Sequence, residues 1–169
     1  MAVLESIKST TSGAITMKPM YPHLNTAVTM ICNILMPEGF DTTADEYKTD
    51  SLEKIYQYYR DEGRVLVWTG ASDNTIFGDP SVNHAFRAWH DYIHITKGFA
   101  FNVQGERLAY LEHCKQIDLY LSHRFNRLDR LHMFRMLDIE VNYQACHMQM
   151  WGEFPVDQRA FMKQHLTIG

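Results

Sequence analysis

Apolar residues recur every three or four positions along most of this chain, which is the spacing of one face of an α-helix. The clearest case is 23–36, where Pro37 and Gly39 follow as residues that end a helix. Its apolar stripe consists of Leu24, Ala27, Val28, Ile31, Ile34 and Leu35. The pattern therefore predicts a helix with one buried face.

A second helix is predicted over 51–61. Asp50 and Glu53 fit a capping arrangement at its start, and Gly63 fits its C-terminal end. The run VLVW at 65–68 is β-like, but it is too short to predict a sheet around it.

After a polar loop at 69–80, the pair Asp79-Pro80 supplies an N-cap and a first-turn proline for a third helix. Lys97 and Gly98 close that helix. This helix carries His90 and His94 one turn apart.

Two further helices are predicted over 104–121 and 126–150, and Pro155 opens a last short helix that runs through His165. The expected buried face of the first comprises Leu108, Leu111, Cys114, Ile117 and Leu121. That of the second comprises Leu128, Leu131, Phe134, Leu137, Val141 and Cys146.

These elements predict a mainly α protein, a single-domain bundle of five or six helices with at most one short β segment. The chain of 169 residues is long enough to bury one core. Residues 1–20 are rich in serine and threonine without strong periodicity, so they are expected to form an extended or flexible arm. Residues 21–169 are expected to form the helical domain.

The composition is that of a globular protein, with 46% hydrophobic and 21% charged residues and a formal net charge of -4. This charge offers no general attraction for nucleic acid. A local basic run is interpreted as a solvated helix face, because its members fall on more than one side of a helix; it comprises Arg124, Arg127, Arg130 and Arg135.

Cys32, Cys114 and Cys146 are too few and too scattered for a disulfide framework, and are interpreted as buried thiols in a reducing compartment. No stretch approaches the 18 or more apolar residues of a membrane span, and the N-terminus lacks the apolar core of a signal peptide. A cytoplasmic location is expected.

The candidate chemistry lies in the third predicted helix and the start of the fourth. His90 and His94 are one helical turn apart on one face, which allows two imidazoles to bind one ion. Asp91 and Glu106 are the carboxylates available to complete the site. However, two histidines on a helix surface and an acidic residue in a first helical turn are also ordinary features of helical proteins. The spacing alone is therefore weak evidence for a metal site.

The full pattern, His90-Asp91-x-x-His94 followed by eleven residues and Glu106, resembles the HDxxH(x11)E hallmark of the coenzyme Q (ubiquinone) biosynthesis family of helical zinc-binding proteins. The resemblance implies that His90, Asp91, His94 and Glu106 ligate a divalent metal, with zinc as the expected cofactor. It covers about 30 residues. A fainter similarity to uncharacterised proteins of tailed phages concerns the segments around 67–91 and 152–162.

Two other metalloenzyme patterns fit less well. A zincin protease carries glutamate where Asp91 stands, and this shorter carboxylate argues against proteolysis. A phosphohydrolase of the His-Asp type needs further ligands upstream and downstream, for which the sequence offers only His84 and Asp118.

Three residues are candidates for a second shell that orients the ligands: His84, Tyr110 and His113. A half-buried polar stripe between helices is the alternative for Tyr110 and His113. Glu140, Gln144 and His147 form another polar row, which faces either this site or solvent.

Two functions remain open at this point. In the first, the protein binds one zinc-like ion, either as a structural element or as a metal-dependent enzyme that acts on a small molecule bearing a carboxylate or carbonyl. In the second, it is a non-catalytic interaction protein or homo-oligomer. That alternative uses its methionines and exposed aromatics such as Tyr56, Tyr58 and Tyr59, with the arm and the loop at 69–80 as contacts.

Overall fold

The computed structural model describes residues 17–168, and in this part of the chain one small sheet and six helices are formed, with α5, η2 and α6 counted as one continuous helix. The predicted mainly α class is confirmed. Almost all of the predicted arm at 1–20 lies outside the described residues. The helical elements are α1 (Pro22–Leu35), α2 (Leu52–Glu62), α3 (Pro80–Lys97), α4 (Val103–Leu121), α5 (Arg127–Leu137), η2 (Asp138–Tyr143), α6 (Gln144–Trp151) and α7 (Gln158–Leu166).

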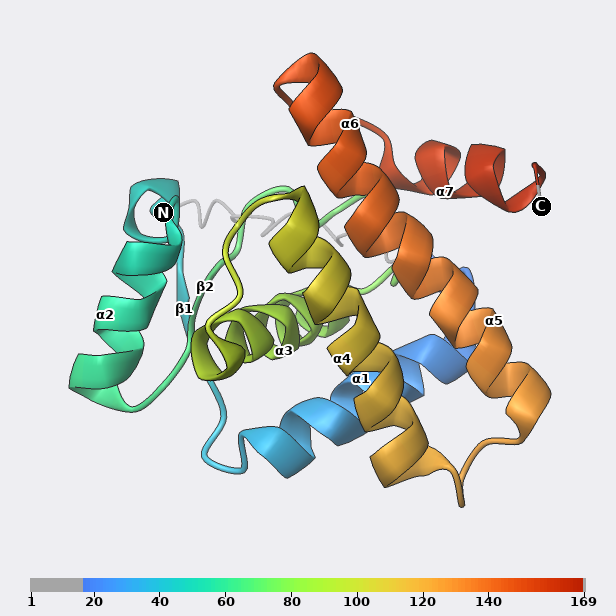
Figure 1. Cartoon of the computed structure of the whole chain (residues 1–169), viewed down its shortest axis with the longest axis horizontal. Coiled ribbons are helices and arrows are strands. Elements are labelled where there is room, and N and C mark those ends of the chain that lie inside the picture. The colour runs from blue at the N-terminus through green and yellow to red at the C-terminus, as the bar shows by residue number, and fades with distance from the viewer. Residues whose placement is uncertain (1–16, 169) are drawn as a thin grey trace, which may run out of the picture.

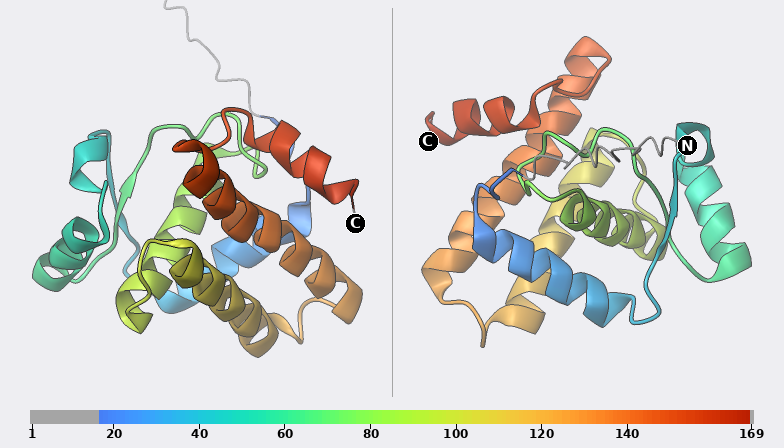
Figure 2. Two further views of the ribbon diagram at one scale, coloured as in Figure 1. Left: turned by 45° about the horizontal axis from the view of Figure 1, so that its top comes forward. Right: turned by 180° about the vertical axis from the view of Figure 1, so that it is seen from behind.

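Helix α3 lies in the middle of the molecule, where it contacts α1, α2 and α4 (Figure 1). The π-helical segment η2 joins α5 to α6 without a break, so the three form one long helix that packs along α4. Helices α2 and α7 lie at opposite ends of the molecule, as Figure 2 also shows. None of the described helices has both the length and the apolar character needed to cross a membrane.

The β-like run at 65–68 pairs with a second strand that the sequence pattern missed. Strand β1 (Asp41–Thr43) lies parallel to β2 (Leu66–Trp68), with Thr42 opposite Val67. Helix α2 and the short 3₁₀ turn η1 (Glu46–Lys48) form the crossover between them. Because β1 has only three residues and no apolar side chain, it carries no alternation from which a strand could be predicted.

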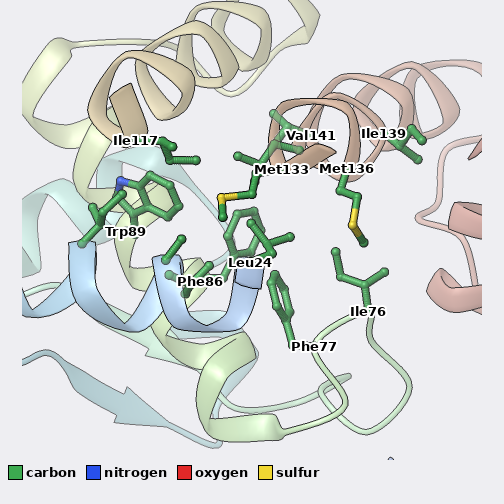
Figure 3. Close-up of a cluster of buried hydrophobic side chains, with 14 of the residues drawn as sticks. Leu24, Ile76, Phe77, Phe86, Trp89, Ile117, Met133, Met136, Ile139 and Val141 are labelled. Atoms are coloured by element: carbon green, nitrogen blue, oxygen red, sulfur yellow. The ribbon is translucent and has the colours of Figure 1, made fainter. Parts of the chain in front are cut away.

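The main core joins all the long helices. Figure 3 shows part of it, with Trp89 of α3 near Ile117 of α4, and Ile76 and Phe77 entering from the loop after β2. A smaller cluster lies under α2 and includes Ile55, Val65 and Val67. The loop at 69–79 is therefore anchored in the core rather than free.

Two predicted helix starts are corrected by the structure. The cap of α2 is Ser51, whose hydroxyl accepts the N–H of Lys54, while Asp50 pairs with the Lys54 ammonium instead. Helix α7 begins at Gln158 with Asp157 as its cap, three residues after the proline that was expected to open it.

The expected buried faces of α4 and of the long helix are partly wrong. Leu108 and Leu111 on α4, and Leu128 and Leu131 on α5, are exposed. Cys146 on α6 is exposed as well, and of the three cysteines expected to be buried thiols Cys32 alone is buried. Ile117 and Leu121 are buried as expected, and α4 also buries Gly105, Ala109, His113 and Gln116. The polar members are compatible with burial because they have partners inside, as when Gln116 Oε1 accepts the indole N–H of Trp89 at 2.7 Å.

A tight connection turns the chain from α3 into α4. Gly98 ends α3 in the left-handed region at φ +70°, and the Asn102 side chain caps α4 by accepting the N–H of Gly105. Gly105 lies so close to the backbone of Ala100 that a Cβ there would overlap the Ala100 carbonyl. This close approach holds the first turn of α4, which carries Glu106, against the end of α3.

Gly105→Ala is therefore expected to destabilise the fold by about 1–3 kcal/mol, although alanine is the better helix former. The measurement is urea unfolding, with Gln104→Ala at the exposed neighbouring position as the control that stays near the wild-type value. A Gly105→Ala protein as stable as the wild type would mean that the turn is not held by this contact.

Candidate metal centre

Three acceptor atoms from α3 and α4 meet at one point. Glu106 Oε2 lies 3.0 Å from His90 Nε2 and 3.4 Å from His94 Nε2, and the two imidazole nitrogens are 3.1 Å apart. The helical spacing brings the two rings together, and the turn after Gly98 brings Glu106 to them. These three residues form a group whose ligand atoms could hold a metal ion.

The site is largely buried, and two of its three side chains are partly exposed. The side chain of His94 is fully buried, whereas those of His90 and Glu106 are each 17% exposed. A ligand at the three atoms would thus be shielded from most of the solvent.

The partner of His94 on its far side determines where its proton lies. His94 Nδ1 is 2.8 Å from the carbonyl oxygen of Phe99, which can only accept a hydrogen bond. Nδ1 therefore carries the proton, and in the neutral ring Nε2 presents a lone pair to the site. A histidine that donates one N–H to a backbone carbonyl while its other nitrogen faces inward has the arrangement found at metal sites.

The three separations match those between ligands of a single ion. Ligand atoms about 2.0–2.2 Å from one zinc ion, at tetrahedral or octahedral angles, lie about 2.8–3.6 Å from one another. Lone pairs and a carboxylate at such distances repel one another unless a proton or a cation lies between them. The group is therefore built to hold positive charge.

The pKa values of His90 and Glu106 are shifted by their attraction for each other. Burial alone would lower the pKa of His90, but the Glu106 carboxylate, with smaller effects of Asp91 and Glu140, raises it above its ordinary value. For Glu106 the effect of burial has the opposite sign, because it raises the pKa of a carboxyl group. His90 and His94 nevertheless hold the pKa of Glu106 well below the usual range. A proton on His90 and the charge on Glu106 thus stabilise each other.

Asp91, the fourth ligand implied by the motif, is not one of the three converging residues. Burial raises the pKa of its carboxyl to about 6, an effect that the nearby charges of His90, His94 and Arg87 only partly offset. Asp91 therefore adds negative potential close to the site without joining the group of ligand atoms.

Of the three residues expected in a second shell, His113 contacts a member of the group. Its Nε2 lies 3.0 Å from His90 Nδ1. His84 instead reaches the loop after β2, with Nε2 3.0 Å from Ser72 Oγ and 3.3 Å from the Thr69 carbonyl oxygen. Tyr110 lies next to Cys114. Burial, and after it the neighbouring Cys114, raise the pKa of the Tyr110 phenol.

Glu140 is a further acidic residue near the site. The polar row of Glu140, Gln144 and His147 does not face one environment. Glu140 and Gln144 are buried and hydrogen-bonded to each other at 2.8 Å, whereas His147 turns away to the carbonyl oxygen of Glu153. Burial raises the pKa of Glu140 to about 7 against the opposing effects of Gln144, Arg87 and His90. Glu140 lies in η2, and such π-helical segments often occur at functional sites.

Comparisons with known proteins found no matching family model, no matching curated protein and no matching solved structure. The likeness to the coenzyme Q biosynthesis family accordingly rests on the spacing of the motif, and the similarity to phage proteins on the two short segments.

Glu140→Gln is expected to stabilise the metal-free protein at pH 8 by about 1–3 kcal/mol. The folded state binds a proton at Glu140 up to about pH 7 and the unfolded state only up to the ordinary pKa near 4.5, so wild-type stability falls as the pH rises through this window. Glutamine cannot ionise and avoids that loss. The difference in the free energy of unfolding between Glu140→Gln and the wild type should vanish near pH 4.

Urea unfolding in the presence of a chelator at both pH values measures this difference. Glu153→Gln, which changes an exposed carboxylate, is the control and should have no such pH dependence. Equal destabilisation by Glu140→Gln at pH 4 and pH 8 would contradict the interpretation.

Proposed function

We propose that this protein binds one zinc ion through His90, His94 and Glu106. The observation that carries the proposal is the convergence of Nε2, Nε2 and a carboxylate oxygen within 3.0–3.4 Å of one another. Two imidazoles and one carboxylate suit zinc and similar borderline metals better than magnesium or calcium, which prefer oxygen ligands. The HDxxH(x11)E spacing supports the same assignment.

The number of ligands favours a site with an open position. Catalytic zinc sites keep three protein ligands and one water or substrate, whereas structural sites are closed by four. Here Asp91 stands outside the converging group, and the edge formed by His90 and Glu106 is partly exposed. We therefore infer that Asp91 tunes the charge around the site and that the fourth position is left to a small molecule or water.

Bound zinc would supply Lewis acidity toward a carboxylate or carbonyl oxygen, or lower the pKa of a bound water toward neutrality. The residues of the chain would provide the rest: Glu106 balances the positive charge, and His94 is held in one tautomer by the Phe99 carbonyl. On this proposal the protein is a metal-dependent enzyme for a small molecule.

Purified wild-type protein at neutral pH is expected to contain about one zinc equivalent per chain. His90→Ala and Glu106→Ala each remove one of three ligands and should abolish stoichiometric binding, measured by elemental analysis after dialysis. A chelator should lower the melting temperature of the wild type but not of these variants, because the ion stabilises only the folded protein that binds it.

His123→Ala, at an exposed histidine after α4, is the matched control and should retain zinc. Asp91→Asn should also retain it, with at most about a tenfold loss of affinity. Loss of zinc in Asp91→Asn would show that Asp91 is a ligand, and a wild type that binds no divalent metal would sink the proposal.

A second candidate function, protein interaction, is favoured by one exposed surface. Large apolar side chains gather at the end of α6 and in the connection to α7, where Trp151 is 67% and Val156 92% exposed, with Met150 and Phe154 nearby in the chain. A cavity of about 290 Å³ lies between α6 and α7 beside them. Such clusters of exposed apolar residues mark contact surfaces.

The tyrosines of α2 support this candidate less than the sequence suggested. Tyr56 is exposed, but Tyr58 donates its hydroxyl to Asp41, and Tyr59 packs against Tyr92 of α3. The surface between α6 and α7 is therefore the better place to test association.

If copies of the chain associate through this surface, the average mass in sedimentation experiments rises above that of the monomer with concentration. Trp151→Ser should then shift the association to higher concentration, since aromatic side chains dominate such contacts. Ile34→Ser, at an exposed apolar position on α1, should leave it unchanged. A wild type that stays monomeric would exclude self-association as this function.

A further inference from the structure

His113 is a buried polar residue that the assignment of ligands leaves without a role. It lies on α4 two turns after Glu106, its side chain is fully buried, and Phe86 and Trp89 of α3 enclose the ring. The Trp89 ring stands perpendicular to it at 4.1 Å between centroids. These aromatic neighbours fix the position of the imidazole.

Among the described residues, the His113 side chain has one hydrogen-bond partner, and that partner is a proposed zinc ligand. His113 Nε2 lies 3.0 Å from His90 Nδ1, and the two rings are inclined by only 10°. Near-coplanar rings allow an N–H of one imidazole to point along the lone pair of the other, which is the best geometry for a hydrogen bond between them. Within residues 17–168 the other nitrogen, His113 Nδ1, has no hydrogen-bond partner.

The direction of that hydrogen bond decides whether His90 can bind an ion. A neutral imidazole has one N–H and one lone pair, so His90 can offer the Nε2 lone pair only when its proton is on Nδ1. That proton needs an acceptor, and His113 Nε2 is the atom in reach. His113 must then be neutral with its own proton on Nδ1.

We propose that His113 is a positioning residue of the zinc site, which accepts the Nδ1–H of His90 and so presents the Nε2 lone pair of His90 to the ion. The inference rests on the proposed function. His94 and His90 are thus oriented by different acceptors, a backbone carbonyl for the first and an imidazole for the second. The second is open to substitution, because it belongs to a side chain.

The test compares zinc affinities of two variants by competition with a chromophoric chelator. His113→Leu removes the acceptor and is expected to weaken binding about 10–100-fold, the usual effect of losing an outer partner of a metal-ligating histidine. His113→Gln places an amide oxygen near the position of Nε2 and should recover most of that loss.

Gln116→Leu is the matched control. Gln116 is buried on the same helix and bonds Trp89, but it does not touch His90, so this variant removes a buried hydrogen bond without changing the acceptor for His90. It should bind zinc as the wild type does, even where its melting temperature falls. A general loss of packing would instead lower the affinity of both leucine variants together.

Nitrogen NMR of the zinc-loaded wild type gives a readout that needs no variant. His90 should carry its proton on Nδ1 and His113 should have an unprotonated Nε2. A protonated His113 Nε2, or a His113→Leu protein that binds zinc as tightly as the wild type, overturns the positioning role alone. A wild type that binds no zinc overturns the proposed function and the positioning role with it.

Discussion

The arrangement of this protein depends on three electron-rich atoms held together in a place that water barely reaches. His90 Nε2, His94 Nε2 and Glu106 Oε2 repel one another unless positive charge lies between them. Against the opposing effect of burial, the Glu106 carboxylate raises the pKa of His90 above its ordinary value, because a proton on His90 lies beside the negative charge. If the proposed function is correct, a proton and a metal ion compete for these three atoms. The fold holds the atoms at separations that suit either one.

The helices around this polar group bury further polar side chains beside the apolar core. The buried face of α4 carries Gly105, Ala109 and polar side chains beside Ile117 and Leu121, while several other leucines of the helix are exposed. Several polar side chains that enter the interior are matched to others: Gln116 to Trp89, His113 to His90, and Gln144 to Glu140. A buried polar interior of this kind limits the apolar area that α4 can bury, and the long helices and the loop at 69–79 supply the remainder.

The parts of this structure that the sequence predicted are those set by local chemistry. The ends of α3 follow from Asp79, Pro80 and Gly98, and the pairing of His90 with His94 follows from one helical turn. The first-turn position of Glu106 was also predicted, and the structure adds the approach of Gly105 to Ala100 that carries it to the histidines.

The parts that were missed depend on contacts between distant segments. Apolar periodicity assigned Leu108 and Leu111 to the core, because the pattern does not reveal that His113 and Gln116 have buried partners. His84 could not be placed from spacing, since its partners Thr69 and Ser72 lie in a loop whose path depends on the whole fold. Glu140 was visible only as a member of a polar row.

The most direct test of the central claim is X-ray absorption at the zinc edge of the zinc-loaded protein. The account predicts a first shell of nitrogen and oxygen atoms at about 2.0–2.2 Å, with the outer-shell scattering of two imidazoles and no sulfur. A shell that contains sulfur at about 2.3 Å, or that lacks the imidazole scattering, would contradict it, because the ion would then be bound elsewhere than at His90, His94 and Glu106.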